Sequence, residues 1–82
     1  METRARLAIS LYCYRIKKYI GAYLAVLGGI DALVFAGGVG EHSAPVRARC
    51  LLGLQPFGLE LDAAKNEGNA PRIDKGPVEI HI

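Results

Sequence analysis

A short apolar run that leads into a glycine-rich loop constrains the fold of this chain more than any other feature. Ala32–Ala36 is fully apolar, which is typical of a strand buried on both faces in a parallel sheet. Three glycines follow within four positions, at Gly37, Gly38 and Gly40, and Ser43 then provides an N-cap for a helix. This strand, loop and helix order brings backbone N–H groups to the start of a helix, where they suit a phosphate or another anion.

The spacing within the loop leaves two interpretations open. The loop is not a P-loop, because no Lys-Ser or Lys-Thr follows the last glycine. It also differs from the Gly-x-Gly-x-x-Gly of dinucleotide-binding folds, because its spacing is Gly-Gly-x-Gly. It therefore indicates either a nucleotide or phosphate site or a tight turn in which glycine only permits positive φ.

The first third of the chain predicts one long helix, Thr3–Leu27. Thr3 is in place to cap it, and Gly28 with Gly29 would end it. An apolar stripe is formed by Ala8, Tyr12, Ile16, Ile20, Tyr23 and Leu27. A helix of this length extends for roughly 35 Å. Its apolar surface exceeds what the rest of the chain can easily cover, so we expect it to pack on missing sequence or on a second subunit.

The sequence also predicts the surroundings of several side chains on this helix. Tyr12, Tyr19 and Tyr23 recur at helical spacing, which favours packing in a core or a subunit interface over a platform for stacked bases. Cys13 is expected to be a small core residue. A solvated face is predicted for three basic residues, Arg15, Lys17 and Lys18.

The remaining elements are shorter. Ala44–Leu52 reads as a second helix with Pro45 at its favoured first position, ended by Gly53. Arg47 and Arg49 on this helix are expected to face solvent or a partner.

The last third of the chain is expected to be mostly turn and loop. Gln55–Leu61 predicts a turn into a short extended piece, and Ala63–Arg72 a polar surface loop. Val78–Ile82 alternates apolar and polar residues and predicts a strand. His81 is then expected to be an exposed strand residue and not a ligand.

Composition excludes some classes of protein. Hydrophobic residues make up 51% of the sequence and charged residues 22%, which is a globular composition. A net charge of +2 is too weak to indicate nucleic-acid binding. Three basic residues (Arg15, Lys17 and Lys18) interrupt the longest apolar stretch, which argues against a membrane-spanning helix. The 2 cysteines, Cys13 and Cys50, lack zinc-site spacing and favour a reduced, cytoplasmic protein without a metal site, although a disulfide stays open.

Three segments together resemble the C-terminal domain of acetate kinases. They are Tyr14–Tyr23, Gly28–Phe35 and Gly37–Ser43. Gly58–Asp62, with Asn66 downstream, is similar to the same family. The resemblance covers nearly the whole chain. It implies an α/β fold that is part of a ribonuclease-H-like, actin-like ATPase domain, with a long N-terminal helix, a short buried strand, the glycine loop, a second helix and a C-terminal strand.

The resemblance also implies a nucleotide site. The family's Gly-Ile-Gly-Glu-Asn segment matches Gly38, Val39, Gly40, Glu41 and His42, which are therefore the expected ATP- or ADP-binding residues. His42 replaces an asparagine amide by a larger, titratable ring. It could contact a phosphate or ribose, or face solvent. Glu41 could orient the loop, or be a solvated carboxylate.

The rest of the family's machinery is expected outside this sequence. Its phosphate-clamping arginines, histidine, aspartate and substrate pocket would precede Met1. Its magnesium-associated glutamate follows a strand that matches Val78–Ile82. Residues 1–82 are thus expected to be a C-terminal nucleotide-binding segment truncated at both ends, with no catalytic or metal residues. Because phosphoryl transfer depends on cations and positioning, the chain alone is expected to be inactive.

Three functional hypotheses follow. The first is the ATP-binding part of an acetate kinase, which forms acetyl phosphate and ADP from acetate and ATP with Mg²⁺; a propionate or butyrate kinase is its nearest competitor. The second is a non-catalytic remnant or a dimerisation module of the same fold. The third, a small basic nucleic-acid-binding protein, is disfavoured by the weak charge. The expected partners are nucleotide and either a second copy or a missing N-terminal domain, with no nucleic acid and no membrane.

Overall fold

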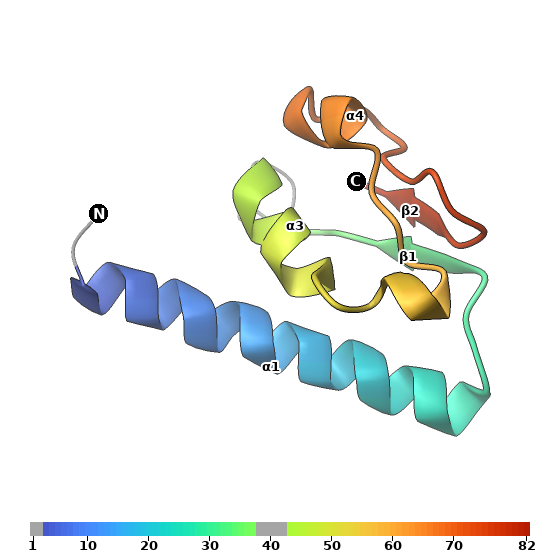
Figure 1. The fold of residues 1–82 in the computed structure, drawn as a ribbon, viewed down its shortest axis with the longest axis horizontal. Coiled ribbons are helices and arrows are strands. Elements are labelled where there is room, and N and C mark those ends of the chain that lie inside the picture. Colours follow the sequence, from blue (N-terminus) through green and yellow to red (C-terminus); the bar gives the residue numbers. More distant parts are fainter. Residues whose placement is uncertain (1–2, 38–42) are drawn as a thin grey trace.

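A long helix lies beside a smaller unit of short helices and strands. The computed structural model describes residues 3–37 and 43–82. The helix α1 (Thr3–Leu27) runs along one side, and its N-terminal end extends past the other elements (Figure 1). The elements that follow are β1 (Ala32–Val34), α3 (Ala44–Leu51), the 3-10 helix η1 (Gln55–Phe57), α4 (Ala63–Glu67) and β2 (Glu79–His81). The fold is thus a mixture of helix and strand, as the sequence predicts.

The predicted bounds of α1 are confirmed, and only part of its predicted apolar stripe packs on this chain. Gly28, at φ 76°, follows the helix and adopts the left-handed conformation expected of a stop. Thr3 is itself helical, so the prediction that it caps the helix is wrong. The side that packs on the chain consists of Ile9, Cys13, Ile16, Ile20 and Leu24. Apolar residues occur on several faces of this helix, so the position of the neighbouring elements decides which face is buried.

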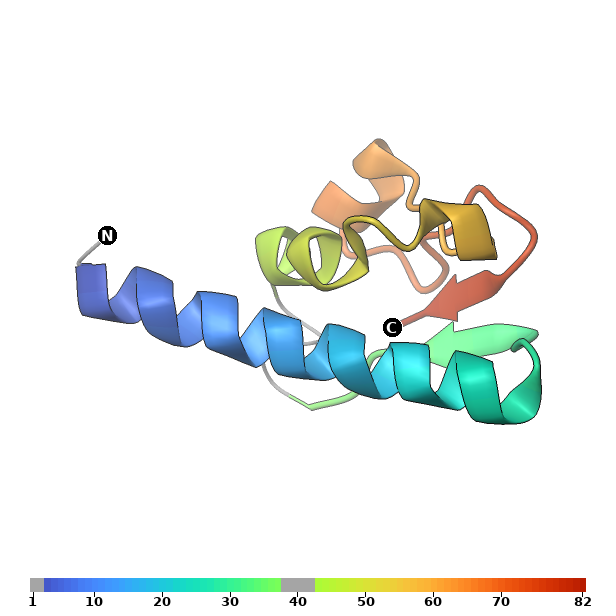
Figure 2. The same ribbon diagram turned by 60° about the horizontal axis from the view of Figure 1, so that its bottom comes forward.

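The two strands form a parallel pair, with β2 between two neighbours. Leu33 is in register with Ile80, and both strands point the same way (Figure 2). On its other side β2 meets the segment around Ile73, whose backbone N–H donates to the Ile80 oxygen at 2.8 Å. This antiparallel contact continues at Arg72 and His81. The predicted strand is therefore present over the shorter range Glu79–His81, with Ile80 and the preceding Val78 buried.

The strand β1 is shorter and more exposed than its sequence predicts. It ends at Val34, although the Phe35 N–H still donates to the His81 oxygen at 2.8 Å. Leu33 is half-buried, but Ala32 and Val34 are exposed, and Val34 is 64% exposed. The expectation of a strand buried on both faces is wrong within this chain. Here β1 is an edge strand, and the described residues cover one of its faces only.

Two clusters form the core. The larger one joins the end of α1 to β2 and the segments around it, through Ile20, Phe35, Leu51, Leu54, Leu59, Ile73, Val78 and Ile80. The smaller one lies between α1 and α3 and consists of Cys13, Val46 and Cys50. Cys13 is therefore a core residue, as predicted, and both cysteines are free thiols.

The region predicted to be a surface loop contains the helix α4. Asp62 caps it, since one of its carboxylate oxygens accepts from the Lys65 N–H at 3.0 Å. The loop prediction over Ala63–Arg72 is wrong for α4. The prediction gave more weight to the turn residues Gly68 and Asn69 than to a capping aspartate followed by good helix formers. The extended piece that was expected before it is present, and Leu61 bridges Asp74 in antiparallel fashion.

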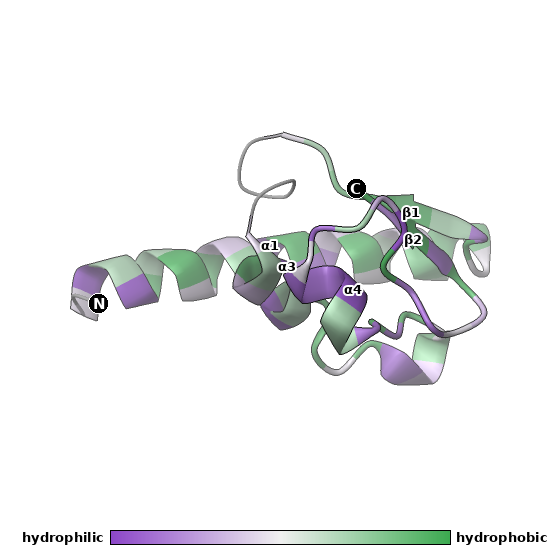
Figure 3. Cartoon of the chain, turned by 90° about the horizontal axis from the view of Figure 1, so that it is seen from above, coloured by the Kyte–Doolittle hydropathy of each residue, from purple (hydrophilic) through white to green (hydrophobic). Residues whose placement is uncertain are grey.

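Much of the apolar surface of α1 faces away from the rest of the chain. Figure 3 shows hydrophobic residues recurring along the whole helix, including the N-terminal end that extends past the other elements. The exposed large side chains on α1 are Leu7, Leu11, Tyr12, Tyr14, Tyr19, Tyr23, Val26 and Leu27. The tyrosines predicted to pack in a core or an interface thus lie outside the core of this chain. Arg15 and Lys18 are exposed, as predicted, and Lys17 is half-buried.

Candidate functional site

The start of α3 is built as the sequence predicts. Ser43 has extended backbone angles, φ −120° and ψ 94°, and its hydroxyl oxygen accepts from the Val46 N–H at 3.4 Å. Pro45 lies in the first turn, as the second helical residue and not the first, and the helix ends at Leu51, one residue early. The N–H groups at such a helix start have few partners within the helix and carry partial positive charge. An anion placed there is stabilised by about 0.3–1 kcal/mol at an exposed site.

The described ends of the glycine loop have the predicted arrangement. Gly37 follows β1 with φ 83°, in the region that glycine adopts most readily, and Ser43 opens α3. The predicted order of the strand β1 before the capped helix α3 is therefore confirmed. The five expected nucleotide-binding residues, Gly38, Val39, Gly40, Glu41 and His42, lie outside the described residues. Their assignment to a nucleotide stays a prediction.

A buried arginine lies directly behind this helix start. Arg47 is 0% exposed, so the expectation that it faces solvent or a partner is wrong, whereas Arg49 is exposed as predicted. The Arg47 Nε donates to Asn66 Oδ1 at 2.8 Å, and Nη2 donates to the Asn66 main-chain oxygen at 2.7 Å and to Asn69 Oδ1 at 2.6 Å. Burial lowers the pKa of Arg47 below its ordinary value. The hydrogen bonds offset part of the cost of that burial.

Residue spacing could have revealed this cluster. The buried residues of α3 are Val46, Arg47, Cys50 and Leu51, which is the i, i+1, i+4, i+5 pattern of one helix face. Arg47 shares that face, so its side chain turns inward with its apolar neighbours. Sequence reasoning missed it because arginine is rarely fully buried unless it is paired.

A small pocket adjoins the start of α3. It has a volume of about 250 Å³ and lies between α1 and α3, lined by Arg6, Ile9, Ser43, Pro45, Val46 and Arg49. The Arg49 Nη2 donates to the Ser10 hydroxyl at 2.7 Å, and that hydroxyl donates to the Arg6 main-chain oxygen at 2.9 Å. Arg6 and Arg49 are thus among the residues around a mostly apolar pocket that lies at the positive end of a helix.

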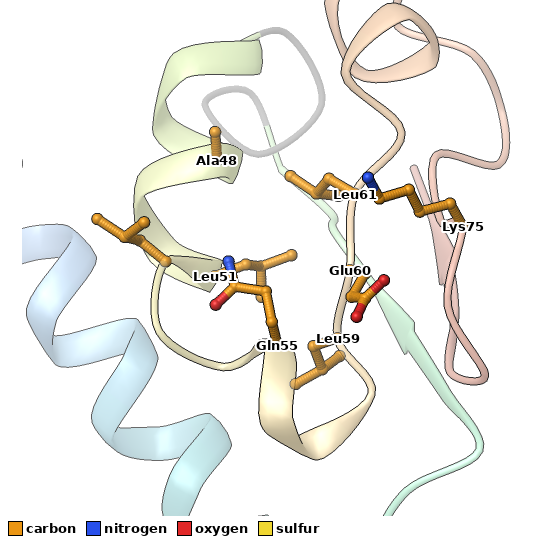
Figure 4. Close-up of a pocket in the computed structure, with 8 residues that line it drawn as sticks. Ala48, Leu51, Gln55, Leu59, Glu60, Leu61 and Lys75 are labelled. Atoms are coloured by element: carbon orange, nitrogen blue, oxygen red, sulfur yellow. The ribbon is translucent and has the colours of Figure 1, made fainter.

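A larger pocket lies at the other end of α3. It has a volume of about 420 Å³, and Figure 4 shows the residues that line it. These are Ala48, Leu51, Leu52, Gln55, Leu59, Glu60, Leu61 and Lys75. Its lining is mostly apolar and includes one charge of each sign, at Glu60 and Lys75. Ser43 does not line it, so it is separate from the pocket at the start of α3.

The side chains of His81 and Cys50 each contact other residues of the chain. His81 is partly exposed, and its Nε2 lies 3.0 Å from a Glu79 carboxylate oxygen. Burial raises the pKa of the Cys50 thiol to about 12, with the neighbouring Cys13 as a second cause. Over residues 3–37 and 43–82, no three His, Cys, Asp or Glu side chains gather as a metal site. Within the same ranges, no helix is both long enough and apolar enough to cross a membrane.

Comparison with known proteins assigns the family. The sequence model of the Acetokinase family matches residues 1–78.

The chain belongs to the acetokinase family. It is 56% identical to the acetate kinase of Syntrophobacter fumaroxidans over 66 residues, which are 80% of this chain and 16% of that protein. It is 52% identical to the acetate kinase of Caldicellulosiruptor saccharolyticus over 83 aligned positions, covering 96% of this chain and 21% of that protein. The resemblance read from the sequence is confirmed.

Solved structures of acetokinase-family relatives match the fold. The crystal structure of Porphyromonas gingivalis acetate kinase superposes with a TM-score of 0.86 at 42% identity, over 95% of this chain and 21% of that one. A propionate kinase from Francisella tularensis superposes with a TM-score of 0.85 at 31% identity, over 98% of this chain and 21% of that one. The chain thus spans about a fifth or less of the length of these relatives.

Proposed function

We propose that this chain is the ATP-binding part of an acetate kinase. The complete enzyme would transfer the γ-phosphoryl group of ATP to acetate, giving acetyl phosphate and ADP. The observation that carries this proposal is the family match over residues 1–78, which includes the strand, glycine loop and capped helix in the described order. The corresponding nucleotide-binding residues are Gly38, Val39, Gly40, Glu41 and His42.

The described residues fit a phosphate-bearing ligand. The capped start of α3 carries partial positive charge, and Arg6 and Arg49 are among the residues that line the adjoining pocket. When bound, ATP supplies the phosphoryl group that is transferred. The role that we propose for this chain is to hold and orient the nucleotide, and we propose that the family's remaining machinery lies outside this sequence.

We assign no Mg²⁺ ligand to this chain. Phosphoryl transfer by kinases uses Mg²⁺ to bridge and neutralise phosphate oxygens. Residues 3–37 and 43–82 offer no cluster of three metal-ligating side chains. As the family resemblance implies, we propose that the Mg²⁺ of the complete enzyme is held with the help of a glutamate that follows a strand matching Val78–Ile82.

The acyl acceptor is proposed to be acetate. The relatives with 56% and 52% identity are both named acetate kinase, whereas the propionate kinase is 31% identical. A propionate or butyrate kinase remains the second candidate, because the acyl pocket would lie in sequence that precedes Met1.

The apolar surface of α1 supports a packing partner, which we propose to be a second copy or an N-terminal domain. Val26 is 81% exposed, and Leu7, Leu11, Tyr19 and Tyr23 are exposed with it. Monomeric proteins rarely expose large contiguous apolar patches without a binding role. A dimerisation module or non-catalytic remnant of this fold is the alternative that this surface favours. In both cases we propose a cytoplasmic protein with no nucleic-acid partner.

Two assays test the proposal. In the first, the purified chain is mixed with ATP, Mg²⁺ and acetate, and ADP release is followed with a coupled assay. We expect no turnover above the blank, and turnover would contradict the proposed division of the enzyme.

The second assay compares ATP with adenosine by thermal unfolding. A ligand that binds the folded state raises the melting temperature by an amount that grows with the ratio of its free concentration to its Kd. We expect ATP to raise it more than adenosine at equal concentration, because the site is proposed to act on the phosphates. Equal shifts, or none, would favour the non-catalytic alternative.

A further inference from the structure

We propose that Asn66 is a positioning residue for the nucleotide, which acts by fixing the first turn of α3. This inference rests on the proposed function. Asn66 lies in α4 and is only 5% exposed, although its side chain is fully polar. A buried amide costs free energy unless its donor and its acceptor are both satisfied. Its hydrogen-bond partners therefore indicate what the residue does.

Both ends of the Asn66 amide bind α3. Nδ2 donates to the main-chain oxygen of Ala44 at 3.0 Å, and Oδ1 accepts from Arg47 Nε at 2.8 Å. Ala44 is the first residue of α3 and Arg47 is the fourth. One side chain therefore spans the first turn of the helix whose start we propose as the phosphate-binding end.

The chemistry of the partners fixes the orientation of this amide. A carbonyl oxygen such as that of Ala44 only accepts, and a guanidinium such as that of Arg47 only donates. If the amide were turned over, Oδ1 would face the Ala44 oxygen, which is also an acceptor, and Nδ2 would face the Arg47 Nε, which is also a donor. A displacement of α3 relative to α4 lengthens both hydrogen bonds, so the amide holds the helix start in one position.

The helix α4 is itself anchored to the sheet side of the fold. Its cap Asp62 donates its N–H to the Ile73 oxygen at 2.8 Å, and the Ile73 N–H donates to the Ile80 oxygen in β2. Asn66 thus connects the start of α3 to the segment beside β2. The strand β1 that precedes the glycine loop pairs with the same β2. The segments on both sides of the glycine loop are therefore connected to the strand β2.

A matched pair of variants separates positioning from general stability. Asn66→Asp keeps the size of the side chain and its acceptor for Arg47 but replaces the donor to Ala44 by an oxygen. Asn69→Gly removes a different acceptor of the same guanidinium, at 2.6 Å, from a residue that has φ 51° and so tolerates glycine. Asn69 follows α4, and its side-chain oxygen accepts from Arg47, so the side chain does not hold Ala44.

The experiment is an ATP titration of the wild-type chain and both variants, followed by two-dimensional NMR at a temperature at which all three are folded. We expect Asn66→Asp to shift the Ala44 and Arg47 amide resonances and to raise the Kd for ATP about tenfold, whereas Asn69→Gly leaves the Kd within about twofold. Melting temperatures of the three chains, measured without ATP, show whether the loss of affinity follows stability.

Three outcomes would overturn the inference. A wild-type chain that does not bind ATP contradicts the proposed function, and the inference fails with it. Wild-type binding with an unchanged Kd in Asn66→Asp contradicts the positioning role alone. A Kd that rises equally in both variants, in proportion to their loss of melting temperature, assigns Asn66 a merely structural role.

Discussion

Arg47 donates through Nε to Asn66 Oδ1 at 2.8 Å, with both side chains buried between α3 and α4. This contact joins two helices whose sequences give no obvious sign that they meet. It places a charge inside a chain of 82 residues, where burial is expensive.

Arg47→Met should destabilise the chain by about 1–3 kcal/mol, because it leaves the buried acceptors of Asn66 without their donor. Urea unfolding followed by circular dichroism measures the change. Arg49→Met on the exposed face of the same helix is the control, and should cost at most about 0.5 kcal/mol. Equal losses in the two variants would show that the buried cluster adds nothing to stability.

The sequence predicted the order of the main elements, and residue patterns explain why. The helix Thr3–Leu27 is indicated by a long helical pattern that ends at glycine. The start of α3 is indicated by the capping hydroxyl of Ser43, and the strand around Ile80 by alternating apolar residues. The helix α4 was missed because its capping signal at Asp62 lies among turn residues. The burial of Arg47 was missed because it depends on Asn66, which is distant in the sequence.

The candidate site was predicted in part. The position of the glycine loop between β1 and Ser43 follows from the local sequence. The pocket between Arg6 and Arg49 does not, because it arises only when α1 packs on α3. The exposed stripe on α1 depends in the same way on tertiary packing, since a helix that is apolar on several faces does not specify which one its own chain covers.

Gly58→Ala should destabilise the chain by about 1–3 kcal/mol. Gly58 has φ 88°, and an added Cβ would lie 2.9 Å from Pro77 Cγ and 3.1 Å from Val78 Cγ2. Gly21→Ala is the matched control, because Gly21 is helical and nothing lies within 4 Å of an added Cβ. That control should stabilise the chain by up to about 1 kcal/mol. Thermal unfolding of the two variants measures both effects, and a neutral Gly58→Ala would contradict the described turn.

Stability should fall between about pH 4 and pH 2 through Asp74. The Arg72 guanidinium, with Nε at 2.8 Å, and the Ile80 N–H lower the pKa of Asp74 from 3.8 to about 2. A carboxyl whose pKa is lower in the folded state stabilises the fold above its unfolded value, and this contribution is lost as the pH falls through the folded value. The free energy of unfolding, measured from pH 6 to pH 2, should show that loss.

Asp74→Asn provides the control for this pH dependence. The variant should be less stable than the wild type at pH 6 and should lose less stability on acidification, because it has no carboxyl to protonate at this position. A variant whose pH dependence equals that of the wild type would exclude Asp74 as the group responsible.

Cys50 should resist alkylation in the folded chain. Its side chain is 0% exposed, and burial raises the pKa of its thiol to about 12, so little thiolate forms at pH 8. Iodoacetamide treatment followed by mass spectrometry should label Cys13 and Cys50 only after urea is added. Rapid labelling of the native chain would show that α1 does not stay packed on α3.

The central claim is that the glycine loop and the start of α3 hold a nucleotide. The most direct measurement is an ATP titration of the wild-type 82-residue chain, followed residue by residue by NMR. The account predicts saturable shifts confined to Gly37–Ser43 and the first turn of α3. No shift at millimolar ATP, or shifts that centre on the pocket between Glu60 and Lys75, would contradict it.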